Sequence, residues 1–80
     1  MRSKDALRLR IYQLCDQKGL TVTGLGKQCG ITQSTLNNIT RGRNNSTTIA
    51  TIKKLCDGLK MELPDFFDSD LFRNLEQEVL

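Results

Sequence analysis

Histidine and tryptophan are absent from this 80-residue chain, and aromatic residues make up only 5% of it. Without an imidazole, the chain lacks the commonest proton-transfer group of enzymes and the nitrogen ligand of many zinc sites. It also has no Gly-rich phosphate loop following a strand, and most of its carboxylates lie in a polar C-terminal segment, where solvation is their usual state. No residue set points to catalysis, so we predict that the chain is not an enzyme and needs no cofactor.

Long apolar runs are missing as well. A membrane-spanning helix needs about 18 or more consecutive apolar residues, and the chain has no such run. Its first ten residues, MRSKDALRLR, carry charges but not the apolar stretch of a signal peptide. We therefore expect one small domain that stays in the cytoplasm and makes no contact with a membrane.

Cysteine is present three times, at positions 15, 29 and 56. The number is odd, the spacings are wide, and no CxxC motif occurs, so a zinc site would lack a fourth sulfur or nitrogen ligand. Each cysteine also falls on an apolar helix face. We interpret the three as small buried side chains, and we predict no metal site.

The charge is divided unevenly along the chain. Residues 1–60 hold eleven Lys and Arg against three Asp and Glu, a net charge of +8, whereas residues 61–80 hold one Arg against six Asp and Glu, a net charge of −5. A basic domain can simply be soluble. Here the positive residues surround one polar motif and the negative residues follow it, which favours one face toward DNA and another away from it.

Apolar residues recur at helical spacing along almost the whole chain. The spacing predicts a helix over 3–18 that ends at Gly19, and a second helix that starts at the cap Thr21 and ends at Gly30. A third helix should cover about 33–40 after the cap Thr32, and Thr47 or Thr48 should cap a fourth. The residues of this fourth helix that are expected to face inward are Ile49, Ile52, Leu55, Cys56 and Leu59. Pro64 can open a short fifth helix with Phe66 and Phe67, and Ser69 or Asp70 can cap a last segment.

The segment from Gly19 to Gly42 has the layout of a helix-turn-helix, in which the second helix enters the DNA major groove. Side chains that can pair with base edges gather on the outward side of the helix over 33–40. The predicted base-reading residues are Gln33, Ser34, Asn37 and Asn38. Gln and Asn can pair with N6 and N7 of adenine, and Asn is a poor helix former, so two in succession suggest a function. The alternative is an ordinary solvated helix face.

Phosphate contacts should come from the starts of the two helices and from the polar segment after them. The predicted phosphate-binding residues are Thr21, Thr23, Thr32, Arg41, Arg43 and Asn44. The alternative for the two arginines is an exposed basic loop without a partner.

The stretches RIYQL, KGLT, LGKQCGITQSTLNNITRG and IKKLCDGLKMELPDFF together resemble the Cro and phage-repressor type of helix-turn-helix, also called the XRE type. The resemblance covers about Arg10 to Phe67. It implies an all-α, five-helix, lambda-repressor-like DNA-binding domain, which we place at 1–68, with a short C-terminal helical extension over 69–80. It also implies that Gln33, Ser34 and Asn38 read bases and that residues around Thr32, Arg41 and Arg43 hold phosphates.

The chain departs from the family pattern at several positions. Val22 stands where many members have a Gln that contacts phosphate, and Gly26 stands where many have Ala. Cys15 and Thr40 replace an Arg and a Glu that pair in many members, so neither charge is left alone. The loop after the third predicted helix is rich in Asn rather than Lys, which predicts weaker phosphate anchoring.

These features predict a sequence-specific transcriptional regulator, a repressor that binds double-stranded DNA as a homodimer. Two half-sites about one helical turn apart would give one short recognition helix useful specificity. The apolar residues expected to support a dimer contact through the tail are Phe66, Phe67, Leu71, Phe72, Leu75 and Val79. The alternative for these residues is that Phe66 and Phe67 close the core of one chain and that residues 73–80 fray. The alternatives are an antitoxin with a toxin partner, and a protein-interaction module that has lost DNA binding.

Overall fold

The computed structural model describes residues 1–41, 47–73 and 75, and every regular element in these residues is helical. The elements in chain order are α1 (Ser3–Lys18), α2 (Val22–Cys29), α3 (Gln33–Thr40), α4 (Ile49–Leu59), α5 (Leu63–Phe67) and the short 3₁₀ helix η1 (Asp70–Phe72). The all-α, five-helix fold predicted from the sequence is therefore confirmed.

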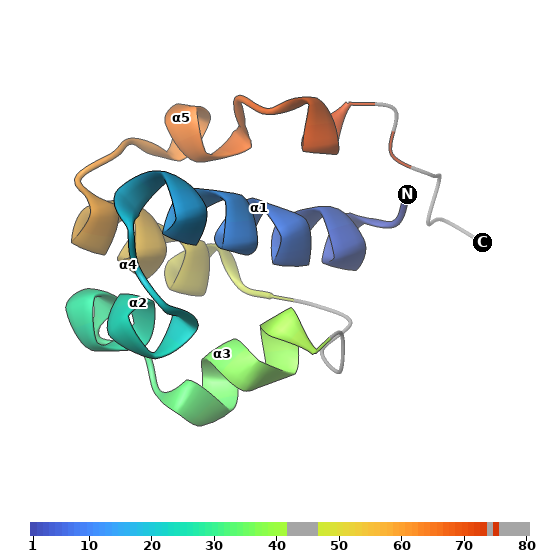
Figure 1. The fold of residues 1–80 in the computed structure, drawn as a ribbon. Coiled ribbons are helices and arrows are strands. Elements are labelled where there is room, and N and C mark those ends of the chain that lie inside the picture. Colours follow the sequence, from blue (N-terminus) through green and yellow to red (C-terminus); the bar gives the residue numbers. More distant parts are fainter. Residues whose placement is uncertain (42–46, 74, 76–80) are drawn as a thin grey trace.

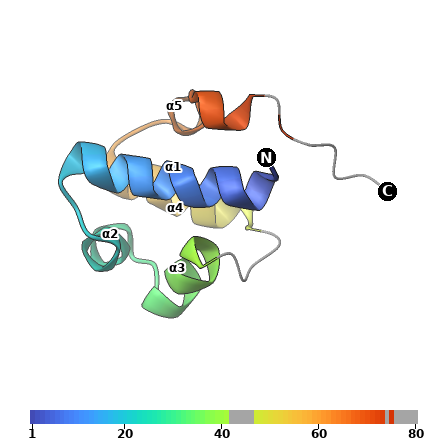
Figure 2. The same cartoon turned by 45° about the vertical axis from the view of Figure 1, so that its right-hand side comes forward.

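The long helix α1 crosses the middle of the molecule and separates two groups of elements (Figure 1). α2 and α3 lie on one side of it, and α5 and η1 lie on the other. α4 runs beside α1 in both views (Figure 2). This arrangement puts the helix-turn-helix on one side of α1 and the described residues 63–73 of the C-terminal segment on the other.

All five helices contribute to one core. The largest fully buried side chains are Ile11 from α1, Leu25 from α2, Leu36 from α3, Leu55 and Cys56 from α4, and Phe66 from α5. Burial of a side chain of this size contributes about 1.5–3 kcal/mol. The core thus ties each short helix to its neighbours, because a helix as short as α2 or α3 is not stable by itself in water.

Local signals set the helix ends. The side-chain oxygens of Thr21, Thr32 and Thr48 each accept a hydrogen bond from a backbone N–H three residues later, at the starts of α2, α3 and α4. Gly19 and Gly30 end α1 and α2 with φ of 65° and 68°, in the left-handed region that favours glycine. The predicted caps are confirmed, and Thr48 rather than Thr47 caps α4.

The segment after α4 is held to α1 by a buried arginine that the sequence did not predict. Arg10 is only 6% exposed, and its guanidinium donates to the backbone carbonyls of Phe66 at 2.7 Å and Asp65 at 2.9 Å. These carbonyls lie at the C-terminal end of α5, where helix carbonyls lack partners within the helix. Arg10 therefore gives the Phe66 carbonyl a donor, gives the Asp65 carbonyl a second donor beside the N–H of Asp68, and ties α5 to α1.

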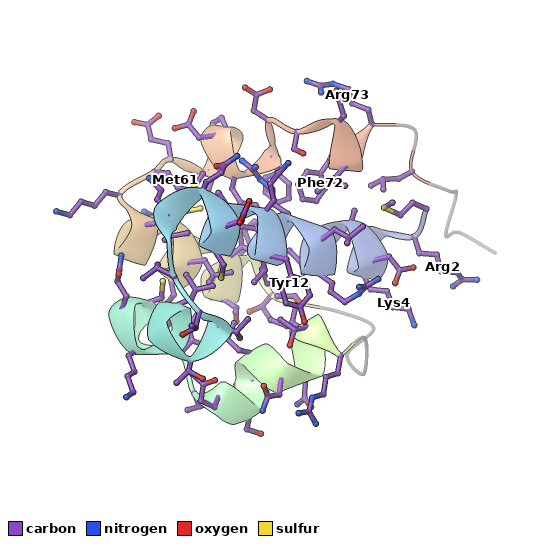
Figure 3. All side chains as sticks on the ribbon, viewed as in Figure 1. Arg2, Lys4, Tyr12, Met61, Phe72 and Arg73 are labelled. Atoms are coloured by element: carbon purple, nitrogen blue, oxygen red, sulfur yellow. The ribbon has the colours of Figure 1, made fainter. Side chains whose placement is uncertain are left out.

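Three phenylalanines form a cluster on the same side of α1. The ring centroid of Phe72 lies 6.0 Å from that of Phe66 and 4.9 Å from that of Phe67. Phe72 points toward α1, whereas Arg73 points away from the molecule (Figure 3). The first part of the predicted extension over 69–80 thus packs on the helical domain, and Val79 lies outside the described residues.

One predicted core residue is exposed. Ile49 was expected to face inward on α4, but it is 63% exposed, while Ile52 one turn later is 7% exposed. Ile49 is the first residue of α4, so it shares the angular position of the buried face but lies before the part of the helix that the other helices cover.

Among the described residues, no helix is both long and apolar enough to cross a membrane.

Candidate nucleic-acid interface

The turn between α2 and α3 fixes the angle of the two helices. Gly30 adopts φ 68°, and the backbone N–H of Ile31 donates to the carbonyl of Gly26 at 2.9 Å. The side chain of Ile31 is buried, as are Leu36 and Ile39 on α3. One side of α3 is therefore anchored in the core, and its other side faces outward in both ribbon views (Figures 1 and 2).

The four predicted base-reading residues differ in exposure. Ser34 is exposed, whereas Gln33, Asn37 and Asn38 are half-buried. All four come from α3, and the two residues nearest its start are Gln33 and Ser34. The structure thus brings the predicted set together on a single rigid helix, with its polar groups at the surface.

Two of the three threonines predicted to bind phosphate at the helix starts use their hydroxyl groups to cap these helices. Thr21 Oγ1 accepts from the N–H of Gly24 at 3.0 Å. Thr32 Oγ1 accepts from the N–H of Thr35 at 3.2 Å and donates to Thr35 Oγ1 at 2.9 Å. Thr23 is exposed in the first turn of α2. A phosphate at the start of α3 would therefore meet backbone N–H groups more readily than the Thr32 hydroxyl proton.

The cationic end of the interface lies at Arg41, directly after α3. Arg41 is exposed, and its backbone N–H closes the helix by donating to the carbonyl of Asn37 at 2.9 Å. A cation at this position lies one helix length from the polar groups at the start of α3. The other two predicted phosphate ligands, Arg43 and Asn44, lie outside the described residues.

Sequence reasoning missed a contact that joins the two helices of the motif. The side-chain Nε2 of Gln33 donates to the backbone carbonyl of Thr23, on α2, at 3.2 Å. The space for this contact exists because Gly26 has no side chain, since a Cβ there would lie 2.4 Å from Nε2. The only sequence signal was a glycine inside a helix, where alanine is the better helix former.

The three cysteines are buried and carry free thiols. Burial raises the pKa of Cys15, Cys29 and Cys56, and for Cys29 the nearby Cys15 and Cys56 raise it further. Burial in apolar surroundings keeps a thiol protonated and unreactive. Within the described ranges, no group of three or more His, Cys, Asp or Glu side chains is placed to hold a metal ion.

Comparison with known proteins identifies the family. A helix-turn-helix family model, HTH_3, matches residues 11–66, which is most of the chain and contains the whole of α2 and α3. The chain belongs to the XRE-type helix-turn-helix family. A search of curated proteins found no match to the chain.

A solved structure supports the same assignment for this helix-turn-helix protein. The chain is similar to a structure described as the crystal structure of the prophage Lp1 protein 11, with 30% sequence identity and a TM-score of 0.81. The similarity covers 94% of this chain and 100% of the other. The resemblance predicted from the sequence is confirmed, and the helix-turn-helix protein is a DNA-binding regulator, with a fold that is not typically that of an enzyme.

Proposed function

We propose that this helix-turn-helix protein is a sequence-specific transcriptional repressor that reads the major groove with α3. The observation that carries the proposal is the polar outer face of α3, with exposed Ser34 and three half-buried amide side chains, on a helix that Leu36 and Ile39 anchor in the core. A recognition helix needs both properties, because its side chains must reach base edges and must hold a fixed position while they do so.

In this proposal Gln33, Ser34, Asn37 and Asn38 contact bases. The phosphate contacts come from the starts of α2 and α3, whose N–H groups attract phosphate, and from the residues after α3. The residues proposed for these contacts are Thr21, Thr23, Thr32, Arg41, Arg43 and Asn44. The charge division supports this orientation, because residues 1–60 have a net charge of +8 and residues 61–80 a net charge of −5. In the described part of this acidic segment, α5 and η1 lie across α1 from α2 and α3 (Figure 1).

The proposed function requires two copies of the chain on DNA. One recognition helix of eight residues covers few base pairs, and a two-fold dimer would read two half-sites about one helical turn apart. Phe67 supports an apolar contact near α5, because it is 39% exposed. Phe72 contributes less to such a surface than its sequence position suggests, because it packs on Phe66 and Phe67.

Selection of bound sequences from random double-stranded DNA tests the proposal. We expect a short inverted repeat, bound with an affinity that falls steeply as salt rises. If the protein enriches no sequence, it is not a sequence-specific repressor. If it enriches one only together with a co-expressed partner protein, an antitoxin-like role replaces the proposal.

Light scattering of a chain truncated after Arg73 tests the dimer separately, because this variant keeps Phe72 and removes residues 74–80. If the truncated chain dimerises and binds the selected repeat as well as the full chain does, the removed residues are not the interface.

A further inference from the structure

Gln33, the first residue of α3, is linked to the backbone of α2 before any DNA is present. Its Nε2 donates to the carbonyl of Thr23 at 3.2 Å. The nitrogen must be the atom that faces this carbonyl, because the amide oxygen can only accept and would be repelled there. The amide therefore lies with Nε2 toward α2, and this bond uses one of the two N–H groups of Nε2.

Gly26 provides the space in which this nitrogen lies. A Cβ built on Gly26 would be 2.4 Å from Gln33 Nε2, which is closer than real contacts allow. The backbone at Gly26 does not require a glycine, because only Gly19 and Gly30 among the described glycines have a positive φ. The missing side chain, and not backbone freedom, is thus what this position contributes.

We propose that Thr23 and Gly26 hold the amide of Gln33 so that Oε1 reads DNA as an acceptor, while one N–H of Nε2 stays on the Thr23 carbonyl and the other lies out of reach of N7. This inference rests on the proposed function, in which α3 enters the major groove. On the groove edge, adenine offers the N6 amino group and cytosine the N4 amino group, whereas guanine and thymine offer only acceptors there. Gln33 therefore selects adenine or cytosine on the strand that it contacts and rejects guanine and thymine.

Base analogues test which atom of Gln33 makes the contact. The base that Gln33 contacts is first identified as the position of the selected DNA sequence whose base preference disappears in Q33A. Adenine is then placed at that position. Purine, which lacks the N6 amino group, should weaken binding by about tenfold or more. In contrast, 7-deazaadenine, which keeps the amino group but lacks N7, should bind within about twofold of adenine. Neither analogue should change the affinity of Q33A.

Two outcomes would overturn the inference while leaving the proposed function intact. A large loss with 7-deazaadenine would mean that an N–H of Nε2 donates to N7. Selection of guanine at the contacted position would mean the same. If instead no DNA sequence is selected at all, the proposed function fails, and the inference fails with it.

A pair of glycine variants tests the role of the space on α2. G26A fills it, so the amide should be released and should become sensitive to loss of N7 by about tenfold. G24A is the matched control, because a Cβ there would meet nothing closer than Thr21 Oγ1 at 3.3 Å. G24A should keep the wild-type response to both analogues, and an identical response in G26A would contradict the proposal.

A measurement on the free wild-type protein does not depend on how well G26A folds. A Cβ on Gly26 would also approach Leu36 Cδ1 to 2.9 Å, so this variant disturbs the core as well. In the wild type, a nuclear Overhauser effect should connect the Nε2 protons of Gln33 with the Hα protons of Gly26. Its absence would show that the amide is not held on α2, and the inference would be wrong.

Discussion

The guanidinium of Arg10 donates through Nε to the backbone carbonyl of Phe66 at 2.7 Å, across 56 positions of sequence. Its Nη2 donates to the neighbouring carbonyl of Asp65, and its charge lies 6.0 Å from the centre of the Phe66 ring. A cation near an aromatic face is stabilised by the ring. One side chain of α1 therefore fixes the C-terminal end of α5 and the Phe66 side chain that closes the core.

We predict that R10M lowers the free energy of unfolding by about 2–4 kcal/mol, because the buried Phe66 carbonyl loses this donor, the Asp65 carbonyl keeps only the N–H of Asp68, and the packing of the Arg10 side chain changes. Chemical denaturation measures this loss. R8M is the control, because Arg8 lies on the same helix in a partly exposed ion pair with Asp5 at 3.6 Å, and should cost less than about 1 kcal/mol. Equal losses in the two variants would show that the bonds to α5 contribute little.

Gly58, on α4, packs directly against Cys29 of α2. A Cβ there would lie 2.4 Å from Sγ and 2.7 Å from Cα of Cys29. We predict that G58A destabilises the protein by about 1–3 kcal/mol although alanine favours helices, because a backbone atom must move. G24A should be neutral or slightly stabilising in the same thermal unfolding experiment. A stabilised G58A would mean that the two helices can separate without cost.

If the outer face of α3 reads bases, S34A and N38A should each weaken binding to the selected operator by about 1–3 kcal/mol. Their affinity for random DNA should stay unchanged, because phosphate contacts carry nonspecific binding. Fluorescence anisotropy with both DNAs measures the difference. T51A, on α4, is the control and should keep the wild-type preference. Equal losses on operator and random DNA would remove these residues from the base-reading set.

If Arg41 contacts a phosphate, R41A should weaken binding to every DNA. It should also reduce the magnitude of the slope of log affinity against log salt concentration by about one unit. R73A removes the same charge from the opposite side of the molecule, where Arg73 pairs with Asp68 at 3.3 Å, and should leave the slope unchanged (Figure 3). A salt titration in which both variants change the slope equally would indicate a net-charge effect rather than a contact.

Because the three cysteine thiols are buried, we predict that the protein becomes less stable at alkaline pH. Burial raises the pKa of Cys15, Cys29 and Cys56, so the folded state keeps protons that the unfolded state has released. The contribution is complete below the ordinary thiol pKa of about 8.5 and is lost as pH rises through the folded values. Denaturation under reducing conditions from about pH 7.5 to about pH 9.5 should show a falling free energy of unfolding. C15A should show a shallower fall, and a flat profile in the wild type would contradict the prediction.

The sequence by itself determined the helices and most of their ends. Each of these features depends on residues a few positions apart, such as Thr32 capping α3 through an N–H three residues later, or Gly30 ending α2. The apolar spacing also identified most of the core, because a helix repeats its buried face about every 3.6 residues. The same local signals sufficed to place four polar side chains on the outer face of α3.

Tertiary structure decided everything that depends on distant residues coming together. Ile49 fits the inward spacing of α4 and yet is exposed, because no described helix covers that end. Arg10 looks like a surface cation in sequence, but it is buried because α5 brings two carbonyls to it. The amide of Gln33 is oriented by Thr23, ten positions earlier, because Gly26 leaves room for it. Helical periodicity cannot predict such contacts, since it states which face is buried and not which atoms meet there.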